Sequence, residues 1–286
     1  MASLILGTAT FGTGYGVANN GLILSDESVR EIIVAAQSLG ITEFDTAPAY
    51  GNAENQLGEF LNYELAPMIS SKISKENTKT VKLMLESVKN TLKRTRASKL
   101  RNLYLHDPDA LFGKSASEVI AGFKELLASG LVDRIGASVY SIESILKSKD
   151  IFPELTVFQV PENICDRRVS NSKEMAVLAS SGNHFIVRSI FLQGLLLMPL
   201  SDIPGGLEKS KSVVAQLIDF ANMHQVSRLD LCLSYAQGIS WAEEFVIGAT
   251  SVSQLQQILK SKFELPTGWQ SKIGTIPEEI LDPRRW

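Results

Sequence analysis

Short apolar runs alternate along the chain with longer segments in which apolar residues recur every three or four positions. The short runs predict β-strands at 4–7, 41–45, 68–71, 102–105, 132–137, 156–160, 185–187 and 245–247. The longer segments predict helices at 25–40, 52–61, 76–96, 115–130, 141–147, 170–180, 207–223, 228–237 and 251–259. About eight strand-then-helix units close a parallel barrel, so we expect an α/β fold. The predicted architecture is a single (β/α)8 TIM barrel over 1–286, with a C-terminal tail from about 261.

Capping residues mark the ends of several predicted helices. Ser25 precedes the first of them and Gly40 follows it, as expected for a hydroxyl N-cap and a glycine stop. Ser115 and Glu118 have the spacing of a capping box, in which each side chain bonds the backbone N–H of the other residue. The helix over 115–130 is therefore expected to begin with this motif.

A glycine-rich stretch follows the first predicted strand. Its glycines, Gly12, Gly14 and Gly16, do not have the G-x-G-x-x-G spacing of a dinucleotide fingerprint. The polar turn that follows at 19–21 is also unlike the start of a helix. We therefore reject a Rossmann-type interpretation.

Charge and cysteine content narrow the functional class. Lys plus Arg (28) nearly balance Asp plus Glu (31), for a net charge of −3, which does not favour a nucleic-acid or anionic-membrane surface. The first residues lack the basic and apolar regions of a secretory signal, and no run approaches the roughly 18 apolar residues of a membrane span. Cys165 and Cys232 lack metal-ligand spacing, so no metal site is predicted. A cytoplasmic location is expected.

Four residues capable of acid–base chemistry lie where the second, third and fourth predicted strands end. Asp45 closes one strand and Tyr50 lies in the loop after it, while Lys72 and His106 follow the next two strands. In parallel barrels, catalytic groups come from the carboxyl ends of several strands. Because consecutive strands are neighbours, we expect these four side chains to converge on one pocket.

Together these side chains suit the reduction of a carbonyl group. A phenol is a weak acid at neutral pH and needs a neighbouring cation to donate its proton readily. Lys72 can supply that cation, and Asp45 can keep the amine charged. His106 can hydrogen-bond a substrate carbonyl oxygen or relay a proton. Hydride from a nicotinamide would then reach carbon while Tyr50 protonates oxygen, and the reverse reaction would oxidise an alcohol.

Eight motifs, in order along nearly the whole chain, resemble the aldo-keto reductase superfamily. They are LGTATFG at 6–12, FDTAPAYG at 44–51 with Glu54 and Leu57-Gly58, SK at 71–72, LYLH at 103–106, GLVDRIGAS at 130–138, Gln159 with Asn163, RSIFLQG at 188–194 and VIGATS at 246–251. The resemblance implies that Asp45, Tyr50, Lys72 and His106 form the catalytic tetrad, with Tyr50 as the general acid. It also implies a soluble carbonyl oxidoreductase that is a monomer or a small oligomer.

The resemblance further implies a nicotinamide site. Ser138 and Gln159 would hydrogen-bond the carboxamide, and Arg188 and Ser189 would contact the ring. Two positions depart from the family pattern: Val139 stands where asparagine is usual, and Arg188 stands where an aromatic residue commonly stacks on the ring. A guanidinium plane can stack on a ring and also donate hydrogen bonds, so we still expect a cofactor contact at Arg188.

The last predicted loop bears on the choice between NADP and NAD. Gly248 and Gln254 occupy the positions where many family members place a lysine and an arginine around the 2′-phosphate. Backbone N–H groups after Ser251, with the hydroxyls of Thr250 and Ser251, could still hold a phosphate. NADP is expected because the family prefers it, with NAD as the alternative. Gln254 also has a purely structural interpretation, as the partner of Ser251 in a capping box.

Structural interpretations compete with the functional ones at other positions. Taken singly, each of the four candidate residues has a structural explanation: Asp45 as a turn former, Tyr50 as a packing residue, Lys72 as a surface lysine and His106 as a turn residue with its hydrogen bonds satisfied. Their joint occurrence at successive strand exits favours a catalytic role. We interpret the other polar and aromatic candidates as structural residues: His184, His224, Trp241, Trp269 and Trp286. Tyr15 is a modest candidate for the wall of the substrate pocket.

Two other functions remain open from sequence. One is a non-catalytic nicotinamide-nucleotide-binding regulatory subunit built on the same barrel, against which an intact tetrad argues. The other is an isomerase or aldolase in which Lys72 forms a Schiff base, which a neighbouring carboxylate disfavours because it keeps the amine charged. A small-molecule carbonyl substrate is expected, but its identity is not encoded in these patterns.

Overall fold

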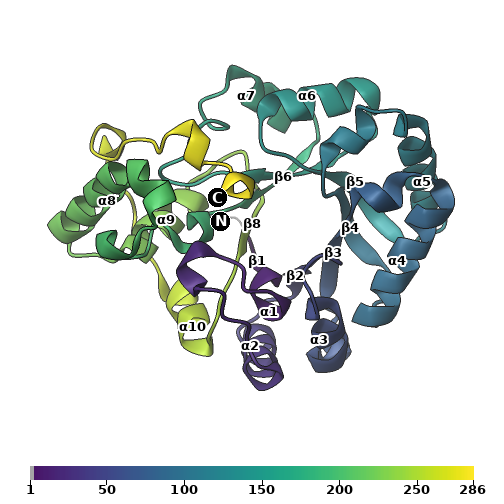
Figure 1. Ribbon diagram of the computed structural model, residues 1–286, viewed down its shortest axis with the longest axis horizontal. Helices are drawn as coiled ribbons and strands as arrows, with labels where there is room; N and C mark the ends of the chain where they lie inside the picture. The colour runs from purple at the N-terminus through teal and green to yellow at the C-terminus, as the bar shows by residue number, and fades with distance from the viewer. Residues whose placement is uncertain (1–2) are drawn as a thin grey trace.

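The computed structural model describes residues 3–286, and its eight strands close into a parallel barrel (Figure 1). The strands are β1 (Ser3–Gly7), β2 (Glu43–Asp45), β3 (Met68–Ile73), β4 (Leu100–Leu105), β5 (Val132–Ser138), β6 (Val157–Pro161), β7 (His184–Arg188) and β8 (Glu244–Ile247). Each strand pairs with its neighbours in sequence, and β8 returns to pair with β1. The predicted (β/α)8 TIM barrel is confirmed.

Helices surround the barrel and follow its strands in turn (Figure 1). They are α1 (Ala9–Gly12), α2 (Asp26–Ser38), α3 (Ala53–Phe60), α4 (Val81–Thr95), α5 (Ala116–Ala128), α6 (Ile142–Ile151), α7 (Lys173–Ser180), α8 (Lys211–His224), α9 (Arg228–Gln237) and α10 (Val252–Lys260). The short α1 was not predicted, because four residues are too few to establish a helical repeat of apolar positions.

The predicted helix over 76–96 is wrong in its first turn. A 3-10 segment at Lys75–Thr78 is separated from α4 by Thr80, whose backbone is extended (φ −146°, ψ 152°). The Thr80 hydroxyl accepts a hydrogen bond from the Leu83 N–H, so this residue caps a new helix. The predicted helix over 207–223 is divided similarly into a 3-10 segment, Gly205–Ser210, and α8.

The predicted capping box at Ser115 and Glu118 is also wrong. Ser115 makes no side-chain cap, and the Glu118 carboxylate instead accepts a hydrogen bond from the Val81 N–H at 3.0 Å. Glu118 therefore caps the neighbouring helix α4, where it satisfies an N–H that has no partner within that helix. A reciprocal capping box does occur at the start of α9, between Ser227 and Asp230.

Two sets of buried side chains fill the fold. Ile5, Tyr104, Val157 and Ile186, from four different strands, contact one another inside the barrel. A much larger apolar cluster lies between the strands and the surrounding helices. Near the amino ends of the strands, Arg101 forms ion pairs with Glu43 and Glu244. This polar cluster closes one end of the barrel, and the carboxyl ends remain available for a site.

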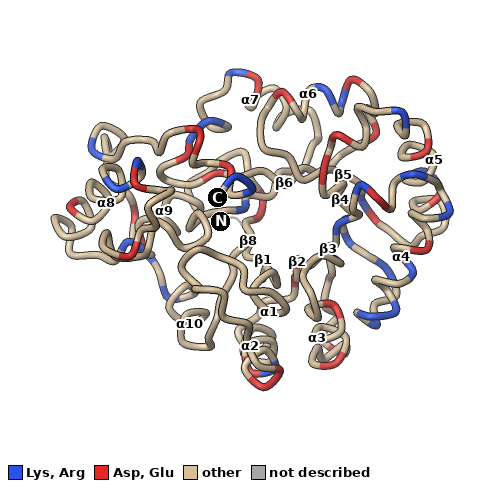
Figure 2. Tube along the Cα trace, in the orientation of Figure 1, with Lys and Arg blue, Asp and Glu red and all other residues tan. Residues whose placement is uncertain are grey.

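Charged residues lie mainly on the outer helices and loops, with both signs interspersed (Figure 2). The segment between β1 and α2 carries no charge at all. Within residues 3–286, every helix is too short or too polar to cross a bilayer.

The C-terminal tail packs back against the barrel on the side of β6 and α9. The backbone N–H of Ile276 donates to the Cys165 carbonyl at 2.9 Å, and the Trp269 ring packs edge-on against Tyr235. The indole N–H of Trp286 donates to the Ile280 carbonyl at 2.9 Å. Both tryptophans therefore anchor the tail, as the structural interpretation predicted.

Candidate active site

An ion pair between Lys72 and Asp45 lies at the carboxyl ends of adjacent strands β2 and β3. The Lys72 Nζ lies 2.5 Å from the Asp45 Oδ1 and also donates to the Thr46 carbonyl at 3.1 Å. Both side chains are almost fully buried. Lys72 lies within β3 and not after it, because the strand continues two residues beyond its predicted end.

The ion pair keeps Lys72 protonated. Burial acts to lower the pKa of the Lys72 ammonium, but the Asp45 carboxylate and the Tyr50 phenol outweigh that effect, and the net pKa is raised. A protonated amine is a hydrogen-bond donor and not a nucleophile. The site therefore holds a fixed positive charge balanced by one carboxylate.

Tyr50 and His106 complete the cluster predicted from the sequence. The Lys72 Nζ lies 5.1 Å from the centroid of the Tyr50 ring, and the His106 ring meets that ring edge-on with centroids 6.3 Å apart. The structure thus brings Asp45, Tyr50, Lys72 and His106 together at the exits of β2, β3 and β4.

Two glycines in backbone contact fix the loop that carries Tyr50. Gly51 has a left-handed backbone (φ 59°), and a Cβ at this position would lie 2.2 Å from the Gly12 carbonyl oxygen. A Cβ on Gly12 would lie equally close to the Tyr50 carbonyl oxygen. The segment after β1 therefore packs directly against the Tyr50 turn, and only glycine permits this approach.

His106 is uncharged at neutral pH. Burial, together with the positive charges of Lys72 and Arg188, lowers the pKa of its imidazole to about 4 and outweighs the opposing charges of Asp45 and Asp107. A neutral imidazole carries one N–H and one acceptor nitrogen. His106 can therefore donate one hydrogen bond to an oxygen atom without carrying charge.

A cavity of about 780 Å³ opens beside Tyr50. Its walls come from the carboxyl ends of β1, β2, β6, β7 and β8 and from the starts of α9 and α10. Its volume is in the range of small-molecule and cofactor sites. Of the predicted site residues, Asp45, Tyr50, Gln159, Arg188, Ser189, Gly248, Thr250 and Gln254 line it, as does the predicted wall residue Tyr15. Lys72, His106, Ser138 and Ser251 are not among its lining residues.

Gln159 connects Asp45 to the cavity. Its amide Nε2 donates to the Asp45 Oδ2 at 2.8 Å, so both carboxylate oxygens of Asp45 have partners. Ser138 is paired with Gln159 across β5 and β6 and is buried. These two polar side chains lie side by side next to the cluster, although only Gln159 reaches the cavity surface.

The loop after β8 is uncharged and internally hydrogen-bonded. The Ser251 hydroxyl accepts from the Gln254 N–H at 3.2 Å. The Gln254 side-chain oxygen accepts from both the N–H and the hydroxyl of Thr250, each at 2.9 Å. Ser251 therefore caps α10 as predicted, but the predicted capping box is incomplete, because the Gln254 side chain bonds Thr250 and not the Ser251 N–H. Gln254 also lines the cavity.

Arg188 lies at the end of β7 and contacts Val139, which stands at the position where asparagine is usual in the family pattern. One guanidinium nitrogen donates to the Val139 carbonyl at 3.1 Å and another to the Ser189 hydroxyl at 3.2 Å. The guanidinium also lies 4.3 Å from the centroid of the Tyr140 ring. The two departures from the family pattern, at positions 139 and 188, therefore touch each other.

Sequence reasoning missed Arg228, which also lines the cavity. Its guanidinium donates to the carbonyl oxygens of Leu196, Leu197 and Met198 and so holds the loop after β7 in place. No local signal marks this role, because the acceptors lie about thirty residues earlier in the chain. Gln193, which also lines the cavity, has a left-handed backbone (φ 54°) that the sequence did not suggest either.

Comparisons with known proteins agree with this geometry. A profile of the Aldo/keto reductase family matches residues 3–273. The chain is 26% identical to L-glyceraldehyde 3-phosphate reductase of Escherichia coli K12, over 92% of this chain and 87% of that protein. It is 29% identical to aldo-keto reductase YhdN of Bacillus subtilis 168, over 50% of this chain and 46% of that protein.

Among solved structures, the fold is similar to that of the thermostable aldo-keto reductase Tm1743. The TM-score is 0.73 at 22% sequence identity, with 93% of this chain and 92% of that chain covered. The family profile covers nearly the whole chain, and the eight-stranded barrel is the fold of the similar solved structure. This chain therefore belongs to the aldo/keto reductase family.

Proposed function

We propose that this protein catalyses the reversible, NAD(P)H-dependent reduction of an aldehyde or ketone to an alcohol, with Tyr50 as the general acid. Family membership supports an oxidoreductase that acts on carbonyl compounds. The observation that carries the proposal is the buried Lys72–Asp45 pair next to Tyr50 at the edge of the cavity.

Each member of the cluster has a distinct role in this reaction. Negative charge develops on the carbonyl oxygen as carbon is reduced, and Tyr50 donates its proton to that oxygen. The Lys72 ammonium stabilises the phenolate that remains. Asp45 holds the ammonium in place, and neutral His106 donates a hydrogen bond to the same substrate oxygen.

The cavity residues fit a nicotinamide dinucleotide. The buried amide of Gln159, with Ser138 beside it, suits a carboxamide, and Arg188 and Ser189 would contact the ring. The loop after β8 offers hydroxyl and backbone N–H groups at the start of α10, where anions bind favourably. The residues concerned are Gly248, Thr250, Ser251 and Gln254. When bound, this cofactor supplies the hydride. We propose NADP as the preferred form, with NAD as the alternative because the loop after β8 lacks a cation.

The test is the Tyr50→Phe substitution, assayed by loss of NADPH and NADH absorbance with a panel of aldehydes and ketones. Loss of the proton donor should lower kcat by roughly 10²- to 10⁴-fold. Binding of NADPH, followed by protein fluorescence, should change less than about twofold, because the phenol is not proposed to hold the cofactor.

Three outcomes would oppose the proposal in different ways. Full activity in Tyr50→Phe would exclude Tyr50 as the acid. Cofactor binding without turnover of any carbonyl, in both proteins, would favour the regulatory binding subunit. Trapping of a substrate on Lys72 by borohydride would favour the Schiff-base enzyme.

A further inference from the structure

Arg188 carries an uncompensated positive charge in the site. Its guanidinium donates only to neutral acceptors, the Val139 carbonyl and the Ser189 hydroxyl. Its Nε is buried and has no hydrogen-bond partner within residues 3–286, and over the same range no carboxylate lies within ion-pair distance of the guanidinium. Burying a charge is unfavourable unless it is paired. The arrangement therefore leaves Arg188 with unused capacity for an anion.

The rest of the site does not neutralise this charge. Lys72 is balanced by Asp45, and His106 is neutral at pH 7. Asp202 also lines the cavity but is exposed and forms no ion pair with Arg188. With Arg188, the catalytic candidates next to the cavity therefore carry a net charge of about +1. Arg228, which donates to carbonyl oxygens, adds a second positive charge at the start of α9. Both charges attract negatively charged ligands.

Arg188 lines the cavity together with Asp45 and Tyr50 of the proposed reaction centre. Its guanidinium donates to the Val139 carbonyl at 3.1 Å, and the Val139 N–H donates to the carbonyl of Gln159 at 3.0 Å. The Gln159 amide in turn donates to Asp45 at 2.8 Å, so a short chain of hydrogen bonds connects Arg188 to the cluster. Tyr15, Tyr50 and Arg188 all line the same cavity. An anionic group bound to Arg188 would therefore share the cavity with the carbonyl that Tyr50 is proposed to protonate.

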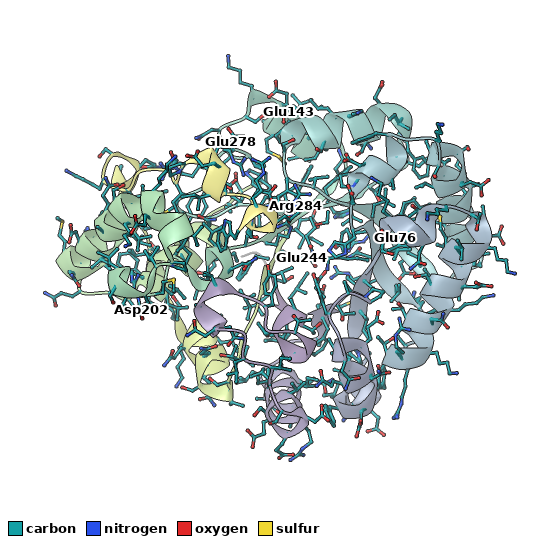
Figure 3. All side chains as sticks on the ribbon, viewed as in Figure 1. Glu76, Glu143, Asp202, Glu244, Glu278 and Arg284 are labelled. Atoms are coloured by element: carbon teal, nitrogen blue, oxygen red, sulfur yellow. The ribbon has the colours of Figure 1, made fainter. Side chains whose placement is uncertain are left out.

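A second arginine provides an internal comparison. Arg284, in the C-terminal tail, lies near the middle of the view in Figure 3, and its guanidinium is 3.8 Å from the centroid of the same Tyr140 ring. Unlike Arg188, it makes a two-pronged ion pair with Asp282, at 2.8 and 2.7 Å. Arg284 is therefore already neutralised, whereas Arg188 is not.

We propose that Arg188 binds an anionic group of the substrate, so that this enzyme prefers aldehydes or ketones that also carry a carboxylate or a phosphate. A guanidinium donates in a planar, fork-like arrangement that matches both groups. The inference rests on the proposed carbonyl reduction and goes beyond the contact between Arg188 and the nicotinamide.

The test compares matched charged and neutral substrates in the intact enzyme with NADPH. The pairs are 4-carboxybenzaldehyde with methyl 4-formylbenzoate, and glyceraldehyde 3-phosphate with glyceraldehyde. We expect kcat/KM to favour the charged member of at least one pair by about tenfold or more, as for a hydrogen-bonded ion. The pair with the larger ratio identifies carboxylate or phosphate as the preferred group.

Variants then assign the preference to Arg188. Arg188→Gln should reduce the ratio to about twofold or less, and Arg188→Lys should retain part of it because the charge remains. Arg284→Gln is the matched control and should leave the ratio within about twofold of the wild-type value, since its charge is already paired. Thermal unfolding of each variant checks that it is folded.

The outcomes separate this inference from the proposed function. If the wild type reduces the neutral aldehydes and shows no preference for either charged partner, the inference is overturned while the proposed function stands. If Arg188→Gln weakens NADPH binding and lowers kcat/KM equally for charged and neutral substrates, Arg188 serves the cofactor and the inference is again overturned. If no carbonyl in either pair is reduced, the proposed function itself fails.

Discussion

At the residue scale, the chemistry of this protein depends on which ionisable groups are paired. Asp45 binds both Lys72 and Gln159, so one buried carboxylate fixes the position of the ammonium and of a cavity-lining amide. The pKa of His106, in contrast, is lowered by burial and by the positive charges of Lys72 and Arg188, which together outweigh the charges of Asp45 and Asp107. Lys72 is therefore held charged, and His106 is held neutral.

The His106 environment predicts a specific loss of stability in acid. The pKa of the imidazole is about 4 in the folded protein, below its ordinary value of 6.5. Between these values the unfolded chain binds more protons, so the free energy of unfolding falls as pH decreases from about 6.5 towards 4. We expect His106 to account for up to roughly 2 kcal/mol of the loss between about pH 7 and pH 4.5.

Urea unfolding of the wild type and of His106→Gln at both pH values measures this contribution. The wild type should lose more stability on acidification than the variant, because glutamine does not titrate. Equal losses in the two proteins would mean that His106 titrates alike in the folded and unfolded states.

At the element scale, the loop after β2 depends on the segment after β1. The contact between Gly12 and Gly51 lets α1 pack against the turn that carries Tyr50. The segment after β1 thus helps to set the position of Tyr50, the proposed general acid, while Lys72 approaches it from β3.

Gly51→Ala should disrupt this arrangement. The added Cβ would meet the Gly12 carbonyl oxygen at 2.2 Å in a backbone with φ 59°, so both strain and collision oppose it. We expect kcat to fall by about tenfold or more, because small displacements of a catalytic group are costly. Steady-state kinetics and thermal unfolding measure the two effects.

Gly40→Ala is the matched control for that substitution. Gly40 also has a positive φ, of 85°, but a Cβ there meets nothing within 4 Å. Gly40→Ala should lower the free energy of unfolding by about 1 kcal/mol and leave kcat nearly unchanged. Unchanged kcat in Gly51→Ala would show that the turn tolerates the collision without moving Tyr50.

At the scale of the whole molecule, the cavity joins parts of the barrel that are far apart in sequence. Its walls combine residues near positions 7–20 with residues from 188–199, 227–229 and 246–258. A ligand that fills it would tie the first and last units of the barrel together. Binding should therefore stabilise the fold as a whole.

Cofactor addition should raise the melting temperature. A ligand present at about 100 times its Kd stabilises the folded state by roughly 2.7 kcal/mol, which corresponds to a shift of about 5–10 °C for a domain of this size. Thermal unfolding with matched concentrations of NADPH and NADH tests this, and we expect the larger shift with NADPH. No shift with either nucleotide at millimolar concentration would contradict the assignment of the cavity.

Much of the site was accessible from the sequence because its key residues follow strands. An apolar run of four or five residues predicts a strand, and in a parallel barrel every such run ends at the same face. Asp45, Lys72 and His106 could therefore be placed together from spacing alone. The short helix α1 and the break before α4 at Thr80 could not be predicted in this way, because neither produces a clear repeat of apolar positions.

The sequence by itself determined the barrel, its approximate strand positions and the convergence of Tyr50 with its three partners, since these follow from local periodicity and parallel topology. Only the tertiary structure decided that Glu118 caps α4 and that Arg228 holds the loop over 196–198. It also decided that Arg188 meets neutral partners while Arg284 meets a carboxylate. The reason is physical: local pattern fixes which face a side chain is on, but its partner comes from another element, and that choice is made only when the elements pack.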